Sequence, residues 1–204
     1  MIIGLGHRKR VGKDTFGEML KTELERRGYI VYKLSFAKRM KDIANQIFFP
    51  LGLCPADYYD RVQHEKEQRL TGDPRSARQL WIEFGNAMRV IAPGIWIKLL
   101  DDDIQAIQDV CGQARVDKPL AFIITDVRFP NEADAINSWG GILVNITRPD
   151  APRASDLAET ALDSCDGWEW TVRNDSGLVW LNSQARMLAI YAISKHNGKA
   201  WKLS

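Results

Sequence analysis

The sequence has few cysteines and no long apolar run. Its 204 residues include three cysteines, Cys54, Cys111 and Cys165, which stand far apart and form no C-x-x-C pair. This pattern excludes a disulfide framework or a thiolate metal site and favours a reducing compartment. No apolar stretch approaches the ~20 residues of a membrane-spanning helix, and the apolar start, Met1 to Leu5, is too short for a signal peptide. We therefore expect a soluble, cytoplasmic protein with no membrane partner.

A strong excess of charge of either sign is also lacking. The chain has 28 Lys and Arg against 26 Asp and Glu, for a formal net charge of +2. This is too small to attract nucleic acid by bulk electrostatics, so we expect no specific nucleic-acid partner. The alternative is a DNA-binding accessory protein that uses the local cluster Arg8-Lys9-Arg10. Its affinity would fall steeply with added salt.

Short apolar segments alternate with amphipathic ones along the chain. Five segments are typical of strands buried on both faces: Ile2 to Gly6, Tyr29 to Ser35, Leu120 to Thr125, Ile142 to Ile146 and Trp168 to Arg173. Helical patterns cover Phe16 to Leu24, Phe36 to Phe48, a segment opening at Asp73-Pro74, Trp96 to Ile107 and Leu178 to Ile193. The alternation predicts an α/β fold, with a parallel sheet of about five strands flanked by helices.

The stretch between the second and third predicted strands is far longer than a crossover needs. We interpret residues 50–115 as a helical substrate-binding lobe inserted into a single domain that spans residues 1–204. The alternative is a solvated helical decoration, above all for the charged segment Tyr58 to Leu70. Residues 148–160, which contain prolines, are interpreted as a lid.

A basic loop joins the first predicted strand to the first predicted helix. It reads His7-Arg8-Lys9-Arg10-Val11-Gly12-Lys13-Asp14-Thr15. A loop that runs into a helix N-terminus presents backbone N–H groups and a positive dipole end to an anion. Gly12 lets the backbone approach phosphate oxygens, and Lys13 can reach the β- and γ-phosphates of ATP. The whole loop is therefore predicted to bind phosphate. The alternative is a basic surface turn capped by Gly12.

The loop departs from the usual phosphate-loop spacing, in which four residues separate the first glycine from Gly-Lys. Gly6 lies one residue too early, and Asp14 follows Lys13 where Ser or Thr normally binds magnesium. Either Thr15 or the Asp14 carboxylate can replace that ligand for a hard cation. A third candidate ligand is Asp126, which ends an apolar strand at the edge where α/β sheets bind ligands. The alternative role of Asp126 is to cap a helix that opens at Pro130.

Phosphoryl transfer needs positive charge around the moving group and around a charged acceptor. The candidates for these contacts are Lys38, Lys41, Arg78, Arg89, Arg128, Arg148 and Arg153. Arg78 and Arg89 are separated by about three turns of a predicted helix and so share one face. That face lies nearly opposite the apolar stripe of the helix, so the alternative is that both arginines face water.

These pieces together resemble the phage deoxynucleoside monophosphate kinases, within the nucleoside monophosphate kinase-like P-loop group. The matching pieces are Gly12-Lys13-Asp14-Thr15, Ser35-Phe36-Ala37 with Lys41, Arg78-Gln79-Leu80 with Gly85, Arg89 and Trp96, the stretch Thr125 to Glu132, and Glu159 with Asn174-Asp175. They cover most of the chain. The resemblance implies a P-loop kinase-like fold and a role in deoxynucleotide metabolism, in the host cytoplasm if the chain is phage-encoded.

The resemblance also implies a reaction: transfer of the ATP γ-phosphoryl group to a (deoxy)nucleoside 5′-monophosphate with Mg²⁺. Lys13, Asp126 and Arg128 would be catalytic, and Asp14, Thr15 and Asp126 would organise the metal. Two alternatives stay open, namely a kinase of another small metabolite, of the dephospho-coenzyme A kinase type, and a nucleotide-binding protein without turnover. The base accepted and the oligomeric state, monomer or homodimer, are left open.

Overall fold

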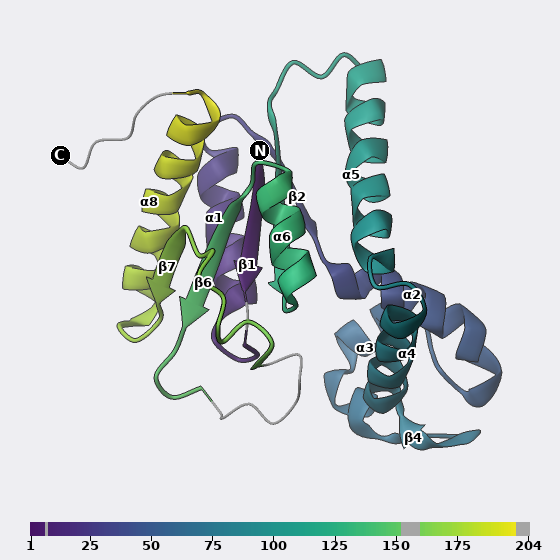
Figure 1. Cartoon of the computed structure of the whole chain (residues 1–204). Coiled ribbons are helices and arrows are strands. Elements are labelled where there is room, and N and C mark those ends of the chain that lie inside the picture. Colours follow the sequence, from purple (N-terminus) through teal and green to yellow (C-terminus); the bar gives the residue numbers. More distant parts are fainter. Residues whose placement is uncertain (7, 152–159, 199–204) are drawn as a thin grey trace. The chain divides into compact units, whose positions relative to one another are not determined.

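The apolar runs of the chain form a five-stranded parallel sheet (Figure 1). The computed structural model describes residues 1–6, 8–151 and 160–198. The strands are β1 (Ile2–Gly6), β2 (Ile30–Leu34), β5 (Leu120–Val127), β6 (Ile142–Thr147) and β7 (Trp170–Arg173). They lie in the order β2-β5-β1-β6-β7, and every neighbouring pair is parallel. All five predicted strands are thus confirmed.

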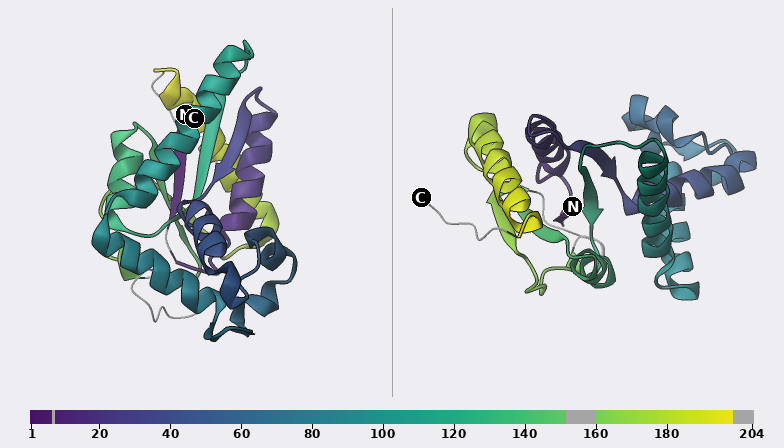
Figure 2. Two further views of the ribbon diagram at one scale, coloured as in Figure 1. Left: turned by 90° about the vertical axis from the view of Figure 1, so that its right-hand side faces the viewer. Right: turned by 90° about the horizontal axis from the view of Figure 1, so that it is seen from above.

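Helices cover both faces of this sheet (Figures 1 and 2). On one face lie α1 (Lys13–Glu25) and α8 (Gly177–His196), and on the other lies α6 (Pro130–Ser138). Alternate residues of β1 show why both faces are apolar: Ile3 and Leu5 belong to the core beneath α1 and α8, whereas Gly4 faces Ile136 of α6. The predicted α/β class, with a parallel sheet flanked by helices, is confirmed.

The chain divides into two compact units, and the sheet belongs to the first, Met1–Ser35 with Ile104–Ser204. The second unit, Phe36–Asp103, is mainly helical. Its elements are α2 (Phe36–Phe48), the short 3-10 helices η1 (Phe49–Leu51) and η2 (Gln63–Glu67), α3 (Ala56–Arg61), the hairpin β3 (Arg69–Leu70) and β4 (Asp73–Ser76), α4 (Ala77–Ile91) and the first part of α5 (Ile95–Gln113). A separate apolar core holds this unit together, built around Leu53, Tyr59, Leu80 and Trp81. A role in substrate binding for residues 50–115 stays a prediction.

The helix expected to open at Asp73-Pro74 begins later, so that expectation is wrong. Asp73–Ser76 forms a strand, and α4 starts at Ala77 with Ser76 as its N-cap. The Ser76 hydroxyl accepts from the Gln79 N–H at 3.3 Å, and the Gln79 side chain accepts from the Ser76 N–H at 2.9 Å. This reciprocal capping box satisfies two helix-end donors, which a proline following an aspartate does not. Asp73 instead accepts from Arg75, whose hydrogen bonds lower the pKa of the Asp73 carboxyl to about 2.

Cys54, Cys111 and Cys165 are free thiols. Across the described ranges, none of the helices combines the length and the apolar character needed to cross a membrane.

Candidate phosphate-binding site

The basic loop joins the central strand β1 to the N-terminus of α1. Gly12 is the N-cap of α1 and has a left-handed backbone, with φ of 95° and ψ of 20°. Its carbonyl accepts the first helical hydrogen bond, from the Phe16 N–H at 2.9 Å. Arg10 also has a positive φ, 60°, which is uncommon for a residue with a side chain. The loop therefore turns sharply into the helix, and the helix end lies at the carboxyl edge of the sheet. His7 lies outside the described residues.

Lys13 is the first residue of α1, and its side chain folds back over the loop. It is only 8% exposed, and its ammonium donates to the main-chain carbonyl of Arg8. A buried lysine needs hydrogen-bond partners to stay charged. The ammonium is therefore held beside the peptides of the loop.

The early glycine of the loop has a reason other than phosphate binding. Gly6 is the last residue of β1, and a side chain there would overlap the indole ring of Trp168. The glycine is required because the ring lies against the backbone. This packing accounts for a glycine that stands one residue too early for the usual phosphate-loop spacing.

Arg8 has an anionic partner within the chain. Its guanidinium pairs with the Asp163 carboxylate through two nitrogen–oxygen contacts of 2.8 Å, both from Nη2. Both side chains are about two-fifths exposed, at 39% and 41%, so the pair contributes little to stability. The basic cluster by itself is thus weaker evidence for an external anion than the sequence indicates. Arg10, Asp14 and Thr15 are exposed.

Asp126 lies on β5, the strand next to β1, at the same sheet edge as the loop. Gly6, the last residue of β1 before the loop, pairs with Val127 of β5. Asp126 is the residue before Val127 and so lies beside the end of β1. The Ser35 hydroxyl, directly after β2, donates to the Asp126 carboxylate at 3.1 Å. Parallel strands bring these polar ends together, as expected for the ligand edge of an α/β sheet.

Glu132 caps the start of α6, the role that was the alternative for Asp126. The Glu132 carboxylate is 2% exposed and accepts from the backbone N–H groups of Arg128 at 2.9 Å and Phe129 at 3.2 Å. These bonds satisfy donors at the start of the helix. The Asp126 carboxylate accepts a hydrogen bond from Ser35.

The loop and its neighbours suit a magnesium nucleotide. The N-terminus of α1 at Gly12 presents backbone N–H groups, Lys13 supplies positive charge, and Asp126 supplies a hard oxygen ligand. Among residues 1–6, 8–151 and 160–198, no three His, Cys, Asp or Glu side chains gather as a metal cage. Magnesium in phosphoryl-transfer sites is held by only one or two carboxylates together with substrate phosphates, so this donor set fits it.

The second unit carries four of the predicted acceptor contacts. Arg78 and Arg89 both lie on α4, on the side that carries Trp81 and the buried Gly85, and both are half-buried. An Arg89 nitrogen lies 3.4 Å from where a side chain on Gly85 would begin, and Arg78 pairs with Glu67. The two arginines are therefore not fully exposed to water, and their role toward an acceptor stays a prediction.

The two candidate lysines, Lys38 and Lys41, lie on α2. The ammonium of Lys41 lies over the Trp81 ring, 5.1 Å from its centre, whereas Lys38 is exposed.

The predicted lid is only partly described. Arg148 follows β6 and is exposed, and Arg153 lies outside the described residues, as do residues 152–159 of the lid. Arg128 follows β5, with its backbone N–H bound to Glu132. Their roles toward phosphate stay predictions.

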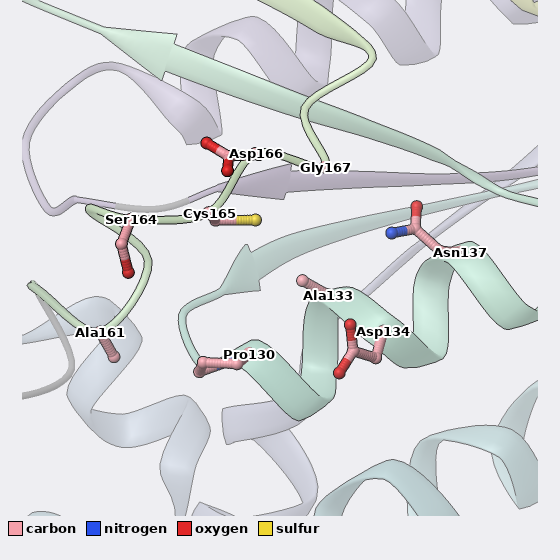
Figure 3. Close-up of a pocket in the computed structure, with 9 residues that line it drawn as sticks. All are labelled: Pro130, Ala133, Asp134, Asn137, Ala161, Ser164, Cys165, Asp166 and Gly167. Carbon is pink, nitrogen blue, oxygen red and sulfur yellow. The ribbon is translucent and has the colours of Figure 1, made fainter.

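A pocket of about 280 Å³ lies elsewhere in the first unit (Figure 3). It is lined by Pro130, Ala133, Asp134, Asn137, Ala161, Ser164, Cys165, Asp166 and Gly167. Its two charged lining residues, Asp134 and Asp166, are acidic and would repel a phosphate. None of the predicted site residues lines it, so the phosphate loop and this pocket are separate features.

Sequence reasoning underrated two side chains at the sheet edge. Ser35 and Asn174 enter the sequence analysis only as pieces of a family resemblance, yet each holds part of the candidate site. Ser35 bonds Asp126, and the Asn174 amide donates to the carbonyl of Val11 at 2.9 Å. The available signal is positional, because each is a small polar residue that directly follows a strand of the sheet.

Comparisons with known proteins add a distant structural likeness. No protein-family model matches the sequence, and a comparison with curated protein sequences finds no match. Among solved structures, dephospho-CoA kinase from Campylobacter jejuni is similar at 15% identity, with 96% of this chain and 98% of that chain covered and a TM-score of 0.46. Shikimate kinase from Aquifex aeolicus vf5 is similar at 13% identity, with 97% and 99% covered and a TM-score of 0.39. At these values neither likeness bears on what this chain does.

Proposed function

We propose that the protein is a P-loop phosphotransferase that moves the γ-phosphoryl group of ATP to a (deoxy)nucleoside 5′-monophosphate. One observation carries the proposal. A loop with left-handed Gly12 runs from the central strand into α1 and Lys13, and Asp126 lies at the same edge on the neighbouring strand. A helix N-terminus, a lysine and a carboxylate together meet the needs of a magnesium-bound polyphosphate.

The roles of the residues follow from where they lie. The Lys13 ammonium would leave the Arg8 carbonyl for the phosphates and neutralise charge on the transferred group. Asp126, oriented by Ser35, would hold the metal together with Asp14 or Thr15 from the first turn of α1. Bound magnesium supplies positive charge that offsets the charge of the phosphates.

The acceptor is assigned to the second unit and the residues after the strands. Arg78 and Arg89 would bind the acceptor monophosphate. Lys38 and Lys41, in the segment after β2, and Arg128, directly after β5, would also contact it. Arg148 and Arg153 would contribute from the lid. No covalent intermediate is needed, because positioning and charge stabilisation carry this kind of transfer.

The proposal is tested by a substrate screen on the purified protein. ADP release from ATP and Mg²⁺ is measured with each common ribo- and deoxynucleoside monophosphate and with dephospho-coenzyme A. Transfer to one or more nucleoside monophosphates is expected. Transfer only to dephospho-coenzyme A would replace the acceptor class, and ATP binding without any transfer would leave a nucleotide-binding protein.

Lys13→Ala should abolish turnover in the same assay while the fold stays intact. Loss of one preorganised charge at a transition state costs roughly a hundredfold to a thousandfold in rate. Circular dichroism and the melting temperature check the fold, and Lys21→Ala, on the same helix and paired with Glu25, is the matched control. A Lys13→Ala protein with near-wild-type turnover would refute the phosphate-loop assignment.

A further inference from the structure

Asn174 connects the phosphate loop to the end of the sheet. It directly follows β7, and its backbone N–H donates to the carbonyl of Thr147, the last residue of β6, at 2.8 Å. Its side-chain Nδ2 donates to the carbonyl of Val11 at 2.9 Å. The backbone anchor holds the side chain in place, so the bond to Val11 ties a turn of the loop to a rigid sheet.

This bond orients one peptide group of the loop. In a trans peptide the carbonyl and the following N–H point in opposite directions. Because Asn174 holds the Val11 carbonyl on one side, the N–H of Gly12 is directed to the other side. Gly12 is the N-cap of α1, so its N–H lies among the donors at the helix end that an anion would meet.

The identity of residue 12 agrees with such close contact. A side chain on Gly12 would begin 2.5 Å from the Asn174 Nδ2 atom, which is too short for any carbon. Glycine at this position is therefore required twice, by the left-handed backbone and by the approach of the asparagine amide.

We propose that Asn174 is a positioning residue of the phosphate loop. By holding the Val11 carbonyl, it presets the Gly12 N–H toward the phosphates of a bound nucleoside triphosphate. The inference rests on the proposed function, since it assigns Asn174 to the donor half of that site. Without the amide, the peptide between Val11 and Gly12 can rotate in the free protein. Binding then includes the entropic cost of ordering this peptide, so the affinity falls.

The experiment compares Asn174→Ala and Asn174→Asp with the wild-type chain. The alanine variant loses the donor and keeps the backbone bond to Thr147. The aspartate variant keeps the shape, but it sets an oxygen against the Val11 carbonyl and adds negative charge beside the phosphates. Asn197→Asp, at the C-terminal end of α8, makes the same chemical change away from the loop.

Dissociation constants are measured by calorimetry with two probes, inorganic tripolyphosphate and ATP, each with magnesium. Asn174→Ala should weaken both by about tenfold, the effect of one lost hydrogen bond, and Asn174→Asp should weaken both further. The KM for ATP should rise while the KM for the monophosphate acceptor stays unchanged. The control should match the wild type.

A purely structural role would have a different signature. Suppose that both variants melt at a lower temperature but bind tripolyphosphate and ATP within about twofold of the wild type. A twofold change is smaller than the effect of a typical hydrogen bond, so this result would show that the inference is wrong. A wild-type chain that binds neither probe would overturn the proposed function, and this inference with it. Normal wild-type binding with unaffected variants would overturn the role of Asn174 alone.

Discussion

At the scale of single residues, the candidate site is organised by small polar side chains that follow strands. Ser35 follows β2 and orients Asp126, and Asn174 follows β7 and holds Val11. Both act on another group and so restrict its orientation. Supporting residues of this kind commonly change metal affinity or activity by about tenfold to a hundredfold when they are replaced. The geometry of the candidate site thus depends on side chains outside the loop itself.

Asp126→Asn should reduce magnesium-dependent turnover much more than it reduces ATP binding. The amide keeps the shape and can still accept from Ser35, but it is a poor ligand for a hard cation. Turnover is measured across a range of magnesium concentrations, and ATP binding by calorimetry. We expect a fall in turnover of about a hundredfold or more, of the size seen when one preorganised charge is lost, partly restored at high magnesium.

The control for this change is Asp134→Asn on α6, which lines the separate acidic pocket and should retain turnover. If Asp126→Asn loses ATP binding and turnover to the same extent, Asp126 has a structural role and the metal assignment is wrong.

At the scale of elements, α4 combines a core face with a basic border. Leu80 and Trp81 pack into the core of the second unit, while Arg78 and Arg89 lie beside Gly85 on the same side as Trp81. A side chain added at Gly85 would begin in ordinary van der Waals contact with an Arg89 nitrogen at 3.4 Å and with Met40 at 3.6 Å. A partly buried guanidinium loses less side-chain freedom when it binds an oxyanion than a fully solvated one.

Arg78→Lys and Arg89→Lys should each lower kcat/KM for the acceptor monophosphate by roughly tenfold to a hundredfold. Lysine keeps the charge but loses the planar fork that matches phosphate oxygens, a difference of about 1.5–3 kcal/mol for a charge-assisted bond. ATP affinity should hardly change, since the donor is assigned to Lys13 and its loop. Steady-state kinetics with the acceptor varied measure the effect.

Arg61→Lys serves as the matched control, because Arg61 is an exposed arginine of the same unit that pairs only loosely with Asp57 at 3.2 Å. Unchanged kcat/KM for the acceptor in both test variants would refute the role of α4 in acceptor binding, even if the protein proves to be a kinase.

At the scale of the whole molecule, the first unit should respond to anions through the phosphate loop. A ligand that binds only the folded state stabilises it, by about 1.4 kcal/mol at ten times its Kd. For a chain of this size that corresponds to a rise in melting temperature of about 3–6 °C. Sulfate or phosphate should produce such a rise, compared with chloride at the same ionic strength, and Lys13→Ala should reduce it.

The same anion should occupy the loop from Arg8 to Lys13 in crystals grown from sulfate or phosphate. A resolved loop whose N–H groups point away from any anion, together with an unchanged melting temperature, would contradict the assignment.

Periodicity was enough to predict the sheet and most helices. Strands buried on both faces are continuously apolar, and this pattern is local, so it can be read without tertiary structure. The start of α4 was misread because two local signals compete there, and the Ser76–Gln79 capping box prevails over Asp73-Pro74. The turn from β1 into α1 was predictable for a related reason, since Gly12 and Lys13 adjoin the strand and the helix that orient them, whereas its binding of phosphate stays a prediction.

Which distant side chains contact the loop was decided by the tertiary structure alone. In the sequence, Gly6 is a loop glycine that stands one residue too early. The structure explains it by the ring of Trp168, distant in sequence, which packs against the Gly6 backbone. The pairing of Arg8 with Asp163 and the bond from Asn174 to Val11 likewise join positions that only the strand order brings together. Sequence alone therefore determined most of the elements and the place of the loop between β1 and α1, because both depend on neighbouring residues. The tertiary structure decided what holds the loop in shape, because those contacts arise when strands distant in sequence pair at one edge of the sheet.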